Sequence, residues 1–325
     1  MCEPGYNSPK FPTNQMHAID IRGLSKDYAV GFWKKKLLPA LKPLDLHVEI
    51  GETFGFLGPN GAGKTTTLKL LMGIIFPTSG TARILDRDCH DPEVKSKIGF
   101  LPEQPYFYDY LSAPELLDYY GQLSGMPHDA RKRRIPEVLD QVGLSDAGSK
   151  QLRKFSKGML QRVGIAQAVI HDPQVLFLDE PMSGLDPLGR HEIRELIQGL
   201  KDAGKTIFFS THILSDAEAL CDRVAVIHKG ELRGIGVVND LRSAVAGKSE
   251  IIWEGSHATA SMGDLLIESH VTGETVRGIV QSSDLDRLLE KLRQQRARLI
   301  SVTPLHGTLE DYFLAQTREK ETVNS

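Results

Sequence analysis

The chain has 325 residues, of which 40% are hydrophobic and 25% charged, and its net charge of −3 argues against a general nucleic-acid binder. No apolar run approaches the roughly 18 residues of a membrane span, and the N-terminus lacks the basic start and apolar core of a secretory signal. The three cysteines are scattered and form no CxxC pair, which is typical of reduced thiols in a cytosolic protein. We therefore expect contact with a membrane only through a partner.

The chain opens with a segment rich in Pro, Gly and Asn, residues 1–15, which we expect to be a disordered lead-in. The main domain is predicted over residues 16–238. Its first stretches, HAIDIRGLSKDY and LKPLDLHVEIGE, alternate apolar and polar residues as half-buried strands do. Later apolar runs are uninterrupted and separated by helical patterns, which predicts an α/β fold with a mainly parallel sheet buried on both faces.

The run GPNGAGKT follows the short apolar stretch TFGFLG and matches the phosphate-binding pattern GxxxxGK[ST]. Glycines let the backbone curl so that successive N–H groups point at phosphate oxygens, and the next helix adds its positive N-terminal end. In this pattern Lys64 reaches the β- and γ-phosphates, and the Thr65 hydroxyl ligates Mg²⁺. We predict a P-loop NTPase whose nucleotide contacts are Gly58, Asn60, Gly61, Ala62, Gly63, Lys64, Thr65 and Thr66.

Between Pro105 and Phe155 the pattern becomes helical, and we predict a helical subdomain over about residues 105–160. The apolar run VLFL then leads straight into Asp179 and Glu180. Such a strand ends at the carboxyl edge of the sheet, where open α/β sheets bind their ligands. Asp179 is expected to hold Mg²⁺, directly or through water, and Glu180 is free to orient the attacking water and take its proton.

From residue 239 to residue 325 the pattern predicts a small α+β accessory domain. KSEIIWEG, TVRGIVQSS and LISVTP are typical of strands, and TLEDYFLAQ of a last helix. A leucine stripe over about two helical turns is interpreted as core packing, because a coiled coil needs roughly three or four heptads. The stripe consists of Leu285, Leu288, Leu289 and Leu292.

Taken in order over about residues 17–237, these motifs resemble the ATP-binding subunit of ABC transporters. The run KFSKGMLQR stands at the place of the family signature, usually LSGGQ. Ser156 and Gly158 fit that form, whereas Phe155, Lys157 and Met159 depart from it. The resemblance implies that the signature of one subunit covers the γ-phosphate bound by the other, in a homodimer or a dimer with a similar ATPase chain. Lys157 would either add a charge near phosphate or lie in solvent.

Three further residues take roles from the same resemblance. Tyr28 matches the aromatic residue that stacks on adenine, a contact worth roughly 1–3 kcal/mol. Asp186, in SGLD, matches the loop that faces the partner subunit, and we count it among the nucleotide-site residues. His212, at the end of FFSTH, matches the switch histidine that contacts the γ-phosphate, and so joins Lys64 and Glu180 in catalysis.

The metal-side sensor is the weakest match. The family pattern places Gln directly after Pro102, but this chain has Glu103 there and Gln104 one position later. Both side chains offer an oxygen to Mg²⁺, and both stay candidates. The cofactors implied are therefore ATP and Mg²⁺, with Thr65, Asp179, Glu103 and Gln104 as metal-side residues.

The resemblance implies an ATPase that converts ATP and water to ADP and phosphate and powers a separate integral membrane permease. Contact with the permease is expected near residues 103–115, with the subunit held peripherally on the cytoplasmic side of the cell membrane. The SKGM signature, Glu103 and the C-terminal unit favour an exporter over an importer. The transported substrate is chosen by the permease.

Two other classes of protein share parts of this pattern. The first is a soluble ABC-type ATPase acting on ribosomes or DNA, but ribosomal types usually carry two ATPase domains, and repair types carry a long coiled coil before the signature. Here a normal domain fills that interval, so we expect no nucleic-acid partner. The second is a GTPase or kinase with the same loop, which would lack the ordered signature, SGLD and His212.

Overall fold

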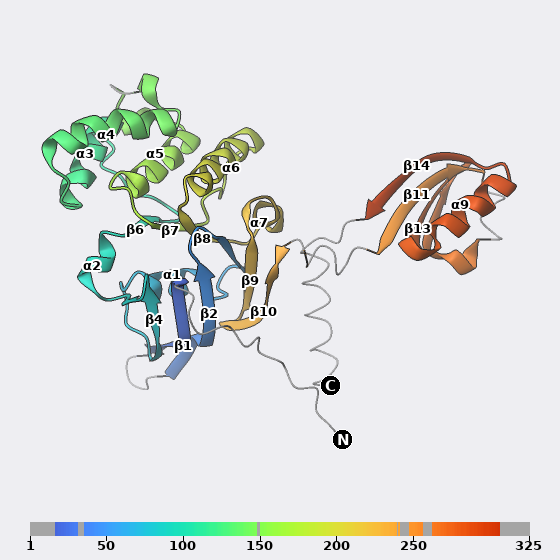
Figure 1. The fold of residues 1–325 in the computed structure, drawn as a ribbon, viewed down its shortest axis with the longest axis horizontal. Coiled ribbons are helices and arrows are strands. Elements are labelled where there is room, and N and C mark those ends of the chain that lie inside the picture. Colours follow the sequence, from blue (N-terminus) through green and yellow to red (C-terminus); the bar gives the residue numbers. More distant parts are fainter. Residues whose placement is uncertain are drawn as a thin grey trace. The chain divides into compact units, whose positions relative to one another are not determined.

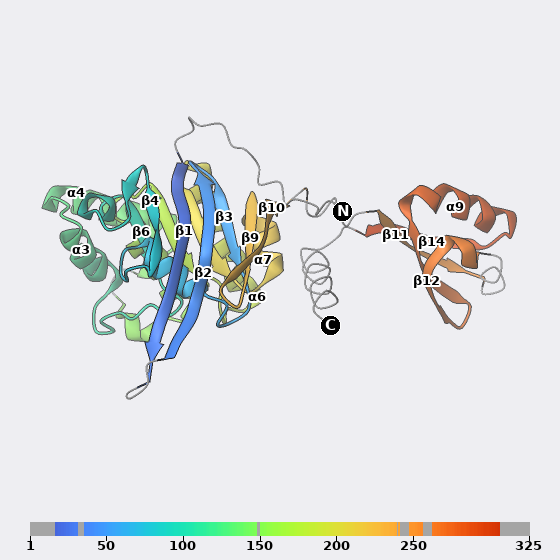
Figure 2. The ribbon, with the colours of Figure 1, turned by 90° about the horizontal axis from the view of Figure 1, so that it is seen from below.

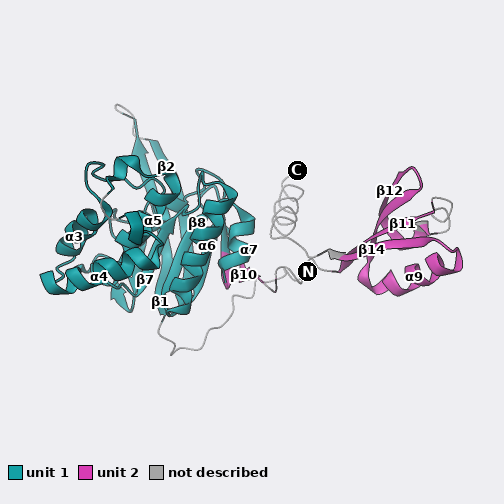
Figure 3. Cartoon of the chain, turned by 90° about the horizontal axis from the view of Figure 1, so that it is seen from above, with its two compact units in different colours: residues 1–221, 225–234 teal, residues 222–224, 235–325 magenta. Residues whose placement is uncertain are grey.

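The computed structural model describes residues 17–31, 36–147, 150–238, 240, 247–255 and 262–305. The lead-in predicted over residues 1–15 and the last helix predicted over residues 308–316 lie outside these ranges. The chain divides into two compact units (Figure 3). One comprises residues 1–221 and 225–234, the other residues 222–224 and 235–325, and each is described by itself.

A six-stranded sheet forms the centre of the first unit, in the order β10-β9-β3-β8-β7-β6. Neighbours β3 and β8, β8 and β7, and β7 and β6 run parallel. Every residue of β3, β7 and β8 is buried, as in strands that are covered on both faces, and this explains their largely apolar sequences. The predicted α/β fold is confirmed. The strands are β3 (Thr53–Leu57), β6 (Ile98–Leu101), β7 (Val175–Asp179), β8 (Thr206–Thr211), β9 (Arg223–His228) and β10 (Glu231–Val237).

A separate antiparallel sheet of four strands, in the order β2-β1-β4-β5, lies beside the central one (Figures 1 and 2). Its strands are β1 (His17–Val30), β2 (Lys36–Glu49), β4 (Ser79–Ile84) and β5 (Arg87–Asp88). The sequence predicted half-buried strands in β1 and β2 but not this second sheet. The alternation follows from its geometry, because the packed face is buried while the other meets solvent.

Seven helices complete the described part of the first unit. Helices α3, α4 and α5 pack against one another and form a helical layer (Figure 1). Helices α3 and α4 lie within the predicted range of about residues 105–160, whereas α5 begins inside it and continues beyond it. Ser112 and Glu115 form a capping box that fixes the start of α3. The helices are α1 (Lys64–Leu71), α2 (Pro92–Lys95), α3 (Ala113–Leu123), α4 (His128–Gln141), α5 (Lys157–Val169), α6 (Pro187–Asp202) and α7 (Leu214–Leu220). Among the described residues, none of the helices has the length and apolarity to cross a bilayer.

The second unit is an antiparallel sheet, β12-β13-β11-β14, with helix α9 (Leu285–Gln294) packed on it. Its core surrounds the fully buried Trp253, and Leu288 and Leu292 are buried there with Leu285 and Leu289 alongside, so the predicted core role of the leucine stripe is confirmed. The sequence missed one strand, β12, because most of its residues are exposed and give no apolar alternation. The strands are β11 (Lys248–Glu254), β12 (Leu266–Thr272), β13 (Thr275–Gln281) and β14 (Arg298–Leu305).

Candidate functional site

The loop between β3 and α1 approaches neighbouring backbone so closely that glycine is required. A Cβ atom at Gly58 would lie 2.3 Å from the carbonyl oxygen of Ile227. Gly63 has φ = 111°, a value that residues with side chains rarely adopt, and it directly precedes α1 at Lys64. The loop therefore ends at a helix N-terminus, which is the geometry that binds phosphate.

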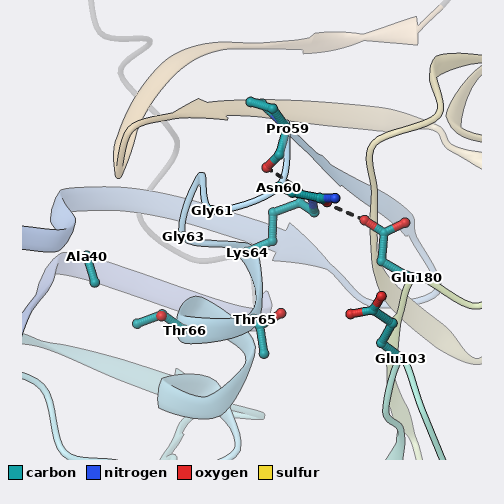
Figure 4. Close-up of a pocket in the computed structure, with 10 residues that line it drawn as sticks. All are labelled: Ala40, Pro59, Asn60, Gly61, Gly63, Lys64, Thr65, Thr66, Glu103 and Glu180. Atoms are coloured by element: carbon teal, nitrogen blue, oxygen red, sulfur yellow. Dashed lines mark hydrogen bonds and ion pairs between the residues drawn. The ribbon is translucent and has the colours of Figure 1, made fainter.

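A pocket of about 300 Å³ opens over this loop (Figure 4). Most of its walls come from the phosphate-binding loop and the first turn of α1, and the rest come from β2, from the segment after β6 and from the end of β7. It is lined by Ala40, Pro59, Asn60, Gly61, Gly63, Lys64, Thr65, Thr66, Glu103 and Glu180. Gly58 and Ala62, also predicted as nucleotide contacts, belong to the loop but are not among these lining residues.

Lys64 is buried, with 6% of its side chain exposed, and its ammonium group is bound on several sides. It donates to the carbonyl oxygens of Gly58 and Pro59 at 2.6 and 3.3 Å, and lies 3.1 Å from Oε1 of Glu180. A buried cation of this kind needs a partner, and here the partner is the carboxylate of the residue that follows β7. Lys64 is thus held at the mouth of the loop.

Asp179, at the end of β7, accepts hydrogen bonds on both carboxylate oxygens. The Thr65 hydroxyl donates to Oδ2 at 3.0 Å and the Ser210 hydroxyl to Oδ1 at 2.5 Å. The Thr65 hydroxyl and Asp179 carboxylate therefore adjoin each other beside the pocket, and such oxygens are the ligands that Mg²⁺ prefers. The donor set fits the cation that the sequence predicted.

Glu180 lies in a strained backbone conformation between a cation and an imidazole. Its φ of 49° is left-handed, and its N–H is held by the hydroxyl and the carbonyl oxygen of Ser210 at 3.2 and 3.1 Å. One carboxylate oxygen pairs with Lys64, and the other accepts from Nδ1 of His212 at 2.9 Å. Three predicted catalytic residues thus meet at one carboxylate. Only 5% of Glu180 is exposed, so its orientation is fixed by these contacts.

The two candidates for the metal-side sensor differ in position. Glu103 lines the pocket and its carboxylate lies on the side of Glu180 (Figure 4), whereas Gln104 is not among the lining residues. Both residues are exposed and lie in the segment after β6, beyond Pro102. The pocket therefore contains two carboxylates, Glu103 and Glu180, against one ammonium group, Lys64.

Four other residues assigned by the family resemblance lie apart from this pocket's lining. Ser156 accepts from the N–H of Met159 at 3.2 Å and caps α5, and Gly158 lies in the first turn of that helix. Asp186 caps α6 by accepting from the N–H of Gly189 at 2.8 Å. Tyr28, on β1, is 39% exposed and pairs with Leu38. None of the four lines the pocket. If a second chain completes the site, Ser156, Gly158 and Asp186 are expected to lie away from their own chain's pocket.

Sequence reasoning missed two contributors to the site. Ser210 binds both Asp179 and the backbone of Glu180, and Ala40 of β2 lines the pocket. Ser210 ends an apolar run next to the predicted His212, so its position at the carboxyl end of a strand was the available signal. Ala40 carried none, because it belongs to a different sheet.

A separate group of potential metal ligands, Asp88, Cys89 and His90, was not predicted, and their ligand atoms lie within 4.8 Å of one another. Burial raises the pKa of the Cys89 thiol to about 11, so the thiol stays protonated at neutral pH, and a protonated thiol is a poor metal ligand. The Cys89 thiol instead donates to the carbonyl oxygen of Leu70 at 3.4 Å. The group is explained by packing.

Comparison with known proteins gives one consistent result. Residues 41–183 match the family model described as ABC transporter. A protein named as an ABC transporter ATP-binding protein in Synechocystis sp. is 46% identical over 316 residues, 97% of this chain and 88% of the relative. The linearmycin resistance ATP-binding protein of Bacillus subtilis is 36% identical over 215 residues, 65% of this chain and 68% of the relative. A solved dimeric ATP-binding cassette in a post-hydrolysis state, bound to ADP and phosphate, superposes with a TM-score of 0.62 and 26% identity, covering 68% of this chain and 98% of that one.

Proposed function

The chain belongs to the ABC transporter family as an ATP-binding subunit, and from that premise we propose that it hydrolyses ATP in a dimer of two such chains and drives a separate membrane permease. The observation that carries the proposal is the position of Glu180, held by Lys64 on one side and His212 on the other beside the phosphate-binding loop. A carboxylate so placed can act as a base next to the γ-phosphate.

In the proposed reaction, the phosphate groups of ATP compete with Glu180 for Lys64. Phosphate oxygens bind the Lys64 ammonium group in place of Glu180, which stays hydrogen-bonded to His212. Glu180 then accepts a proton from water as the water oxygen bonds to the γ-phosphorus. The bond from that phosphorus to the β–γ bridging oxygen breaks, and ADP leaves with its electrons. Positioning and charge neutralisation supply most of the rate.

Thr65 and Asp179 are the residues that would hold Mg²⁺, since their oxygens adjoin each other at 3.0 Å beside the pocket. The ion neutralises phosphate charge when bound. Ser210 keeps the Asp179 carboxylate oriented toward Thr65 through its bond to the second oxygen. Glu103 approaches the same pocket from the segment after β6.

Dimer formation is proposed because the signature residues do not line their own chain's pocket. Ser156 caps α5 and Gly158 lies in its first turn, and the N-terminus of a helix binds phosphate well. In a head-to-tail dimer they would face the nucleotide of the partner. We expect the ATPase rate per chain to fall as the protein is diluted below its dimerisation constant, measured as phosphate release over a dilution series. A rate per chain that is constant at all dilutions would contradict the shared site.

The permease contact is proposed at a cluster of exposed tyrosines within and beside residues 103–115. Tyr108 contacts Tyr110 and Tyr119 with ring centroids 6.0 and 5.8 Å apart, and a groove of about 430 Å³ opens beside them. Exposed aromatic side chains of this kind are enriched at protein interfaces. Held by the permease, the subunit would lie peripherally on the cytoplasmic side of the membrane.

Export is proposed as the direction of transport. The linearmycin resistance relative has a role in resistance by its name, and resistance through transport requires removal of the compound from the cell. The sequence has no feature that identifies the substrate, which the permease would select. Purification of the chain with the membrane protein encoded beside it would test the partner.

Glu103 gives a further prediction. Replacing Glu103 by glutamine removes one of the two carboxylates that face the phosphates, so metal-free ATP should bind about five- to tenfold more tightly. The factor by which Mg²⁺ strengthens binding should shrink correspondingly. Titration with a fluorescent ATP analogue, in EDTA and in Mg²⁺, measures both.

The neighbouring residue supplies the control. Gln104→Glu adds a negative charge to the same segment but outside the pocket lining. Its ATP affinity should stay within about twofold of that of the natural chain. If Gln104→Glu weakens metal-free binding while Glu103→Gln leaves it unchanged, Gln104 is the residue that faces the nucleotide.

A further inference from the structure

Helix α5, which begins at the signature, is tied to the loop that carries Glu180. Gln161 is only 4% exposed, and its Nε2 donates to the carbonyl oxygen of Pro181 at 2.7 Å. Pro181 directly follows Glu180 and is buried itself. This hydrogen bond is therefore one residue from the catalytic carboxylate, and it comes from an element that carries no residue of the pocket lining.

A second contact joins the same helix to the same loop. A Cβ atom at Gly184 would lie 2.1 Å from Nζ of Lys157, so the ammonium group occupies the space over this glycine. Gly184 has φ = 67° and lies two residues before Asp186. Lys157 and Gln161 are four residues apart and share one face of α5. The side chain of Lys157, a residue that departs from the usual signature, thus reaches toward the chain's own loop, residues 180–186.

The strained backbone of Glu180 explains why such contacts matter. A glutamate adopts φ near 49° only where its surroundings hold it there. Ser210 binds the N–H of Glu180 on one side. On the other side the carbonyl oxygen of Glu180 accepts from the N–H of Ser183 at 3.0 Å, and Gln161 fixes the next carbonyl group. The peptide units on both sides of the residue are therefore restrained.

We propose that Gln161 is a positioning residue that holds Glu180 in its active conformation and links the signature helix to it. In the proposed dimer the start of α5 faces the partner's nucleotide, while Glu180 serves the nucleotide of its own chain. Engagement of the signature at one site would thus adjust the base at the other. The inference rests on the proposed function, because it needs Glu180 to act in hydrolysis.

Gln161→Met tests the positioning role. Methionine has a similar length but no N–H donor, so the Pro181 carbonyl group loses its partner. We expect kcat to fall by about 10- to 100-fold, as misplaced catalytic groups do, with KM and ATP affinity within about twofold. Gln167→Met is the matched control, since Gln167 is half-exposed on the same helix, and its kcat should not change. An unchanged kcat in Gln161→Met, or a rise in KM alone, overturns the proposal.

Gln161→Glu adds a second measurement, the pH dependence of kcat, which a purely structural role would not change. This measurement does not depend on how well the methionine variant folds. A protonated glutamic acid donates to the Pro181 carbonyl oxygen, whereas an ionised one cannot, and burial favours the protonated form. The ratio of its kcat to that of the natural chain should therefore rise several-fold between about pH 8.5 and about pH 6. A ratio that is flat with pH contradicts the hydrogen bond's role.

The proposed function and the positioning role of Gln161 can be disproved separately. If the natural chain does not hydrolyse ATP, or if Glu180→Gln retains turnover, the proposed function is wrong. If the natural chain hydrolyses ATP and Glu180→Gln does not, but Gln161→Met behaves like Gln167→Met, only the positioning role is wrong.

Discussion

Replacing Glu180 by glutamine should reduce ATP turnover by about 100-fold or more while ATP still binds, because general-base catalysis contributes roughly that factor or above. The amide keeps the shape of the carboxylate. Its single oxygen can accept from Lys64 or from His212, which bind different oxygens of Glu180, and the amide cannot take a proton from water. Turnover is measured as phosphate release at saturating MgATP.

The same variant should accumulate as an ATP-bound dimer, since hydrolysis would release the two chains in the proposed dimer. Size-exclusion chromatography with MgATP, compared with ADP, checks this. Glu195→Gln is a matched control, because Glu195 is an exposed acid on α6, and its turnover and elution should equal those of the natural chain. Turnover in Glu180→Gln close to that of Glu195→Gln would remove Glu180 as the base.

Replacing Lys64 by alanine should weaken ATP binding by about 30- to 150-fold, the equivalent of about 2–3 kcal/mol for a lost charge-assisted hydrogen bond to phosphate. The substitution also leaves Glu180 buried without its cation, and an uncompensated buried charge destabilises a fold. Thermal unfolding without nucleotide should therefore begin at a lower temperature. Calorimetric titration with MgATP gives the affinity.

Lys69→Ala separates these effects from a general loss of positive charge. Lys69 lies in the last turn of the same helix and is exposed, so both the affinity and the unfolding temperature should stay close to those of the natural chain. Unchanged ATP affinity in Lys64→Ala would refute the assignment of the phosphate-binding loop.

The parts of this protein that the sequence predicted well are those whose signal is local. The strand, the glycine-rich turn and the helix that begins at Lys64 are consecutive, and an unbroken apolar strand leads directly to Asp179 and Glu180. The central sheet could be foreseen for the same reason. Strands buried on both faces are apolar throughout, whatever their neighbours are.

The parts that the sequence did not predict depend on contacts between distant residues. The pairing of β1 with β4 brings together segments that lie on either side of the phosphate-binding loop, and no local pattern encodes it. Which of Glu103 and Gln104 faces the pocket depends on the backbone direction of one exposed segment, where both residues are polar. The position of Lys157 over Gly184 likewise exists only once the loop has folded against α5.

Trp253, fully buried in the core of the second unit, makes that unit separately observable by fluorescence. The sequence has only two tryptophans, and the other, Trp33, lies outside the described residues. A Trp33→Phe protein would therefore have one indole, whose emission shifts to longer wavelength when the core around it opens to water. Denaturant titrations of that protein would follow the second unit alone. Loss of ATP binding in the same samples would follow the first, so the cooperativity between the two units becomes measurable.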